Sequence, residues 1–85
     1  MNNIFVQFNG TTLNPVALMQ ALLAGGIQAI SVETSRWVRY DELTDTEADA
    51  GPRLDVELAY GARPDVQPRI KALEDFIAAS PLVTT

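Results

Sequence analysis

The densest group of side chains able to do chemistry is an acidic run between residues 41 and 49. It holds five of the eleven carboxylates and no base: Asp41, Glu42, Asp45, Glu47 and Asp49. Three of them alternate along the chain in the way that calcium ligands begin an EF-hand loop. Counted from Asp45, such a loop needs Gly where Ala50 stands and Glu where Val56 stands. The sequence therefore does not favour calcium, and we expect no metal site.

Two other interpretations of this acidic run stay open. Thr44 and Glu47 have the spacing of a capping box, which predicts a short helical turn ended by Gly51 and Pro52, in a solvated connector. Alternatively, the run docks onto a basic partner surface. Clustered charge of one sign accelerates association by steering, so that binding would be sensitive to salt.

The remaining residues give little indication of a catalytic site. The chain has no Cys and no His, so it lacks a thiolate nucleophile and the commonest general base. Glu33, Asp55 and Glu57 could form paired carboxylates, but the last two fall on the polar side of an alternating strand. Lys71 falls on the polar side of a helix, where it can pair with Asp75. We expect a protein that is not an enzyme and binds no cofactor.

Arg36, Trp37 and Arg39 together suggest a surface on which nucleic-acid bases could stack. Strand alternation, however, places the two arginines on opposite faces, so no basic patch forms. With a pI near 4.3, we expect no direct nucleic-acid binding. Trp37 is more typical of a core or interface anchor, with Arg39 lying along its indole or paired with an acid.

Two strands and a helix are predicted in the first half of the chain. Residues 4–8 alternate and are rich in β-formers, and Asn14 with Pro15 begins a helix over residues 15–24 that ends at two glycines. This helix is apolar nearly all round, which is typical of burial on most sides. Residues 27–34 return as a strand with Ile30 and Val32 on one face. The strand–helix–strand order favours a right-handed crossover with parallel pairing of the two strands. The apolar face expected for the helix consists of Val16, Met19, Leu22 and Leu23, with Leu18 on the remainder.

The second half of the chain predicts more strand and an amphipathic helix. Residues 36–40 continue the preceding strand or form a hairpin at Thr34 and Ser35, and residues 53–60 alternate strictly through Tyr60. After a break at residues 61–64, Asp65 caps a helix over residues 66–79. Residues 82–84 could add a short edge strand. The apolar stripe of the second helix is Val66, Ile70, Leu73 and Ile77, joined by Phe76.

These elements predict one α+β domain over residues 1–85: a single sheet of three to five strands with two helices packed on one face. The order is βαβββα, or a ferredoxin-like βαββαβ if the terminal edge strand forms. The most apolar stretch, residues 15–24, is too short to span a membrane, and the N-terminus lacks the basic residues of a secretory signal. We therefore expect a soluble, cytoplasmic protein.

Charge is distributed very unevenly, because the first 32 residues contain no Asp, Glu, Lys or Arg. Such a segment must be buried in the protein's own core or against a partner. This favours a non-catalytic assembly domain that forms a homo-oligomer, as a subunit of a larger complex such as a virion. The alternative is a small acidic inhibitor or adaptor that occupies a basic surface, such as the nucleic-acid groove of an enzyme. A ligand-sensing regulatory domain is a weaker third hypothesis. The expected contact residues are Val16, Leu18, Met19, Leu22 and Trp37 for assembly, and the five carboxylates of residues 41–49 for the alternative.

Overall fold

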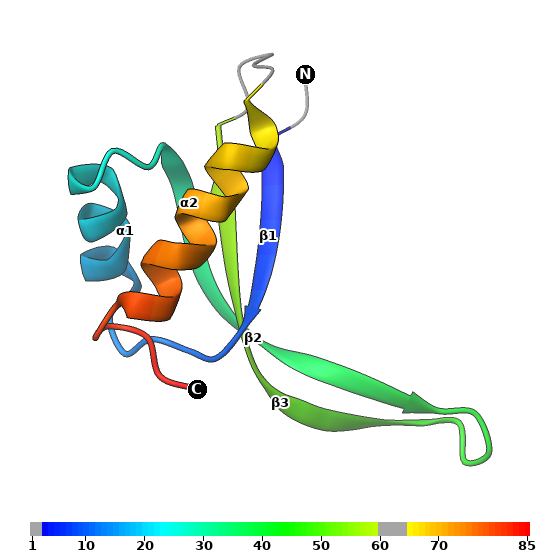
Figure 1. The fold of residues 1–85 in the computed structure, drawn as a ribbon. Helices are drawn as coiled ribbons and strands as arrows, with labels where there is room; N and C mark the ends of the chain where they lie inside the picture. The colour runs from blue at the N-terminus through cyan, green and yellow to red at the C-terminus, as the bar shows by residue number, and fades with distance from the viewer. Residues whose placement is uncertain (1–2, 60–64) are drawn as a thin grey trace.

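A computed structural model describes residues 3–59 and 65–85; the predicted strand end at Tyr60 and the break at 61–64 lie outside them. The described residues form a three-stranded antiparallel sheet with two helices on one face, which confirms the α+β class (Figure 1). In chain order, the elements are β1 (Ile4–Asn9), α1 (Pro15–Ala24), β2 (Ala29–Asp41), β3 (Thr46–Leu58) and α2 (Val66–Ala79).

The strand order in the sheet is β1-β3-β2, with β3 antiparallel to both neighbours. β1 and β2 therefore run in the same direction, but the predicted direct pairing between them is wrong because β3 lies between them. The tight turn between β2 and β3 makes these two strands a hairpin, and β1 pairs with the other edge of β3. The described elements follow the order βαββα, which has one strand fewer than either predicted order. Residues 36–40 continue β2, and residues 82–84 contribute one isolated bridge, between Thr84 and Thr11, in place of a strand.

β3 lies at the centre of the sheet and supplies the middle of the core. Its alternating Leu54, Val56 and Leu58 are almost fully buried, as the sequence predicted. Both helices pack against them, α1 with Leu18 and Leu22 and α2 with Leu73 and Ile77. Among the described residues, no helix has the length and apolar character needed to cross a membrane.

The ends of α1 are those that the sequence predicted, but its buried face is not. Asn14 Oδ1 accepts a hydrogen bond from the Ala17 amide at 3.0 Å, and the Gly25 amide donates to the Ala21 carbonyl at 3.0 Å. Leu18 and Leu22 are fully buried, whereas Val16 is 66% exposed and Leu23 is 51% exposed. Helical periodicity could not fix the rotation of this helix, because apolar side chains surround it on every side.

A β-bulge near the start of β2 overturns the predicted alternation of residues 27–34. Ala29 pairs with Leu58 and Ser31 pairs with Glu57, so Ile30 is an extra residue without a partner on β3. The side chains of Ala29 and Val32 therefore both face the helices, and Ile30 is 46% exposed.

β2 and β3 continue as a two-stranded arm beyond the end of β1. The last residue of β1, Asn9, pairs with Arg53, whereas β2 and β3 remain paired as far as Asp41 and Thr46 (Figure 1). We refer to residues 36–52 as the arm. It contributes to the elongated shape of the molecule, which measures 45 × 30 × 18 Å.

The arm also replaces the helical turn predicted for the acidic run. Strand pairing reaches Asp41 and Thr46, and the residues between them form the tip, with Asp45 at a φ of 52°. The Thr44 hydroxyl lies 2.6 Å from that of Thr46, within the tip. Gly51, predicted to end a helical turn, instead lies within β3 at a φ of 111°, where a second bulge shifts the register.

Candidate interaction surface

Each face of the arm carries a different set of side chains. Directly opposed residues on antiparallel strands point to the same face of a sheet. The face on the helix side carries apolar and acidic groups, and the open face carries the tryptophan and the second arginine of β2. From the pairing register, the helix-side face consists of Arg36, Val38, Tyr40, Glu47 and Asp49, and the open face consists of Trp37, Arg39, Asp41, Thr46 and Ala48.

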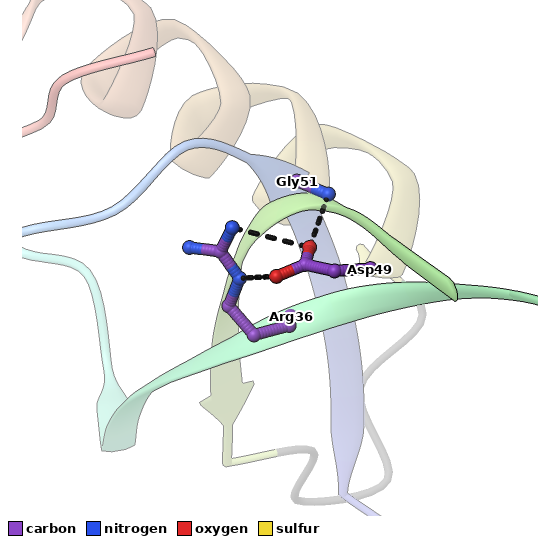
Figure 2. Close-up of polar contacts among 3 residues, drawn as sticks. All are labelled: Arg36, Asp49 and Gly51. Carbon is purple, nitrogen blue, oxygen red and sulfur yellow. Dashed lines mark hydrogen bonds and ion pairs between the residues drawn. The ribbon is translucent and has the colours of Figure 1, made fainter. Parts of the chain in front are cut away.

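A bidentate ion pair joins the two strands at the base of the arm. Arg36 Nε donates to Asp49 Oδ2 at 2.9 Å and Arg36 Nη2 donates to Oδ1 at 3.1 Å (Figure 2). The Gly51 amide also donates to Asp49 Oδ1, at 2.8 Å. These donors, the Arg36 guanidinium first, lower the pKa of the Asp49 carboxyl below its ordinary value. Among the five carboxylates of residues 41–49, Asp49 is thus committed to holding the arm together.

The lowered pKa of Asp49 predicts a specific pH response. A carboxyl whose pKa is lower in the folded state stabilises that state above its unfolded pKa, and this contribution is lost as the pH falls through the folded pKa. We expect carbon-detected NMR titration to place the Asp49 midpoint below the ordinary value for an aspartate. Arg36→Gln should raise the Asp49 midpoint, because it removes the guanidinium that lowers this pKa most. Equal midpoints for Asp49 in the two proteins would contradict the ion pair.

The outer part of the arm exposes large apolar side chains. Val38 is 57% exposed, Tyr40 is 54% exposed and Leu43, at the tip, is 96% exposed. The Tyr40 hydroxyl donates to Asp45 Oδ1, an interaction that raises the pKa of Tyr40 and ties the tip to β2. A two-stranded hairpin alone is only marginally stable in water. The arm therefore has exposed apolar surface and little packing of its own to hold it.

Trp37 lies at the root of the arm, where it is partly buried on the open face. The guanidinium of Arg53 lies 5.4 Å from the ring centroid, so Arg53 takes the place expected for Arg39. Arg53 also donates to Asp55 Oδ1 at 2.9 Å and to the Ser35 hydroxyl at 3.1 Å. The indole N–H is buried without a hydrogen-bond acceptor. Trp37 thus anchors the arm to the body of the same chain.

An apolar groove of about 420 Å³ runs between α1 and the outer edge of β2. Val16 and Met19 line it from α1, and Ile30 and Val32 line it from β2. Glu33, at the same groove, is the first charged residue of the chain. Among the described residues, no strand pairs with the outer edge of β2 along this groove.

The structure separates the residues predicted to bind partners into three groups. Val16 and Met19 line the groove, but Leu18 and Leu22 are fully buried in the core and cannot contact a partner. Trp37 lies at the root of the arm. The five predicted carboxylates all lie on the arm, between Asp41 and Asp49. In the described part of the chain, no three carboxylates are arranged to hold a metal ion.

Sequence reasoning missed Val38, Tyr40 and Leu43 as interface candidates. The available signal was the pairing of apolar Val38 and Tyr40 with acidic positions, since Asp49 and Glu47 lie opposite them. A strand that faces a core has apolar partners at the opposed positions. Recognising the mismatch requires the register, which a bulge at Gly51 shifts by one residue.

Comparison with protein-family models, curated proteins and solved structures finds no match to this chain. The arm and the groove are therefore the features of the molecule from which a function can be inferred.

Proposed function

We propose that this protein is a non-catalytic interaction domain that self-associates through its arm, as a structural subunit of a larger assembly such as a virion. The observation that carries this proposal is the arm, which exposes Val38, Tyr40 and Leu43 beyond the end of β1. Every buried apolar residue lies outside residues 36–52. The arm is thus not needed to complete the core, and a partner would give it the packing that it lacks.

The physical drive for assembly is the burial of these apolar groups. Each Å² of apolar surface removed from water contributes about 25 cal/mol. The Arg36–Asp49 pair joins the two strands at the root of the arm, so that the arm is partly ordered there before a partner binds. A preorganised element loses less conformational entropy on binding than a loose loop does.

Light scattering after size exclusion tests this proposal on the full chain at low and high salt. We expect a discrete oligomer, at an integral multiple of 9.2 kDa, whose mass is the same at both salt concentrations. Apolar burial does not weaken when charges are screened. A monomer at high protein concentration under both conditions would contradict self-association.

A pair of variants locates the interface on the arm. Replacing Val38 and Tyr40 together by Thr keeps residues that favour β-structure but removes apolar surface, and should give the monomer mass. Leu13→Thr is the matched control, because Leu13 is 98% exposed and lies outside the arm. This control should keep the mass of the parent protein. Loss of the oligomer in the control alone would place the interface elsewhere.

The alternative function is an acidic adaptor or inhibitor whose arm tip binds a basic surface. It is supported by the placement of Asp41, Glu42 and Asp45 at the exposed end of the arm, with no base between residues 41 and 49. Binding would then weaken steeply with salt. Glu42→Lys, at the exposed tip and outside β2, should weaken capture of a basic partner while the oligomer mass is unchanged, which distinguishes this function from self-association.

A further inference from the structure

We propose that two copies of the chain form a symmetric dimer by pairing their β2 strands edge to edge, so that each arm covers the α1–β2 groove of the other copy. This inference rests on the proposed self-association and names its geometry. An edge strand presents unpaired N–H and C=O groups that a second strand can satisfy. β2 is an edge strand and runs for 13 residues from the groove to the arm, long enough to bring both features into one interface.

Symmetry restricts how the two β2 strands can pair. An antiparallel pair of identical strands is related by a two-fold axis perpendicular to the sheet, which leaves both pairs of helices on the same side. Residues that oppose one another then come from the same face. On β2, Glu33 opposes Asp55 and Ser35 opposes Arg53, on the open face, and Arg39 follows on that face by alternation. Glu33 can therefore meet Arg39 of the second copy.

Charge and the length of the paired segment together select one register among those that the symmetry allows. With the axis at Arg36, Glu33 of each copy directly opposes Arg39 of the other, so that the dimer contains this favourable pair twice. An axis at Glu33 would oppose that carboxylate to itself, and an axis at Trp37 would oppose it to Asp41. Opposite charges on facing strands are favourable and like charges are unfavourable. An axis at Tyr40 would also oppose opposite charges, Arg39 and Asp41, but it would pair only residues 39–41 of β2. The axis at Arg36 combines complementary charge with pairing of residues 31–41.

The same register joins the apolar surfaces. On the helix-side face, Val32 opposes Tyr40 of the second copy and Thr34 opposes Val38. Tyr40 and Val38 are the exposed residues of the arm, and Val32 lines the groove beside α1. The arm of each copy therefore lies along the groove of the other and covers it.

Arg36 meets its own symmetry mate at the axis. This contact is tolerated because the bidentate pair with Asp49 neutralises each guanidinium within its own chain. The proposed dimer thus gives the Arg36–Asp49 pair a second role at the centre of the interface. The resulting sheet is continuous across the dimer, in the order β1-β3-β2-β2-β3-β1.

A charge-swap cycle tests the register. Glu33→Arg alone or Arg39→Glu alone turns both favourable pairs into repulsive ones, and each should raise the dimer dissociation constant about tenfold or more. The double variant Glu33→Arg/Arg39→Glu restores opposite charges and should recover most of the parent affinity. Because both residues are exposed, each variant should fold like the parent protein and give the same circular dichroism spectrum. Equal dissociation constants in all four proteins would overturn the proposal.

Single cysteines provide an independent test, because the chain contains none. Arg36→Cys places two thiols opposite one another at the axis, where facing Cβ atoms lie about 5 Å apart. A short bismaleimide should then join two chains in high yield. Glu74→Cys, on the exposed side of α2, is the matched control and should give little cross-linked dimer.

The two tests separate this inference from the proposed function. An oligomer that neither cross-links through residue 36 nor responds to the charge swap would overturn β2 pairing and leave self-association standing. If the parent protein is a monomer in light scattering and Arg36→Cys gives no cross-linked dimer, both β2 pairing and self-association are overturned. Cross-linking at residue 36 together with recovery in the double variant would support both.

Discussion

Leu18→Ala is expected to lower the free energy of unfolding by about 2–5 kcal/mol, the range typical of a fully buried leucine. Leu23→Ala, five residues later on the same helix, should cost less than about 1 kcal/mol. Leu18 is fully buried against β3 and α2, whereas Leu23 is 51% exposed. An 85-residue domain has roughly 4–13 kcal/mol of total stability, so the first change removes a large fraction of it.

Urea denaturation followed by circular dichroism measures the difference between the two variants. We expect a clearly lower midpoint for Leu18→Ala and nearly equal slopes, since both proteins expose similar surface when they unfold. The measurement should be made at a protein concentration where both variants have the same oligomeric state, because association itself adds stability. Equal losses in the two variants would mean that α1 is rotated relative to the sheet.

The strands and helices themselves were largely predictable because their local signals are strong. Asn14 and Pro15 fixed the start of α1, and the strict alternation of Leu54, Val56 and Leu58 fixed the buried face of β3. The pairing of Lys71 with Asp75 at 2.8 Å was also expected from their spacing. Each of these features depends on residues close together in the chain.

The features that sequence could not predict depend on residues distant in the chain. The face that α1 buries is decided by its fit to β3 and α2, since Val16, Leu18 and Leu23 are equally apolar. The bulge at Ile30 leaves no signature in composition. The arm exists because β1 ends at Asn9 while β2 and β3 continue, and strand lengths in different parts of a sheet are set by pairing.

The structure shows which residues of the uncharged first third of the chain are buried in the core and which are not. It is expected to be buried in the protein's own core or in an interface, and the structure places part of it in the core and part at the exposed groove. Leu18 and Leu22 complete the core, whereas Val16, Met19 and Ile30 remain at the groove. The proposed dimer accounts for the second group, because the arm of the other copy covers it.

Removal of the arm is expected to abolish self-association completely while the body of the domain stays folded. The variant joins Ser35 to Arg53 through Asn-Gly in place of residues 36–52. Ser35 and Arg53 are directly paired, and Asn-Gly is a favoured two-residue link between antiparallel strands. The eight apolar residues that are buried in the described ranges 3–59 and 65–85 are all retained, and the shorter connection costs less loop entropy.

The shortened protein should be a monomer in light scattering and should unfold in one cooperative thermal transition. It loses the hydrogen bond from the Gly10 amide to the Pro52 carbonyl and the stacking of Arg53 on Trp37, so a modest fall in Tm of a few degrees is expected. Exchanging Thr44 and Thr46 for Ser, which keeps the arm, is the matched control and should leave the oligomer mass unchanged. A shortened protein that still forms the parent oligomer would show that α1 or the open face of the sheet carries the assembly. Because the edge of β2 from Ser31 to Ser35 remains in this variant, the result also shows whether the arm is required for β2 pairing.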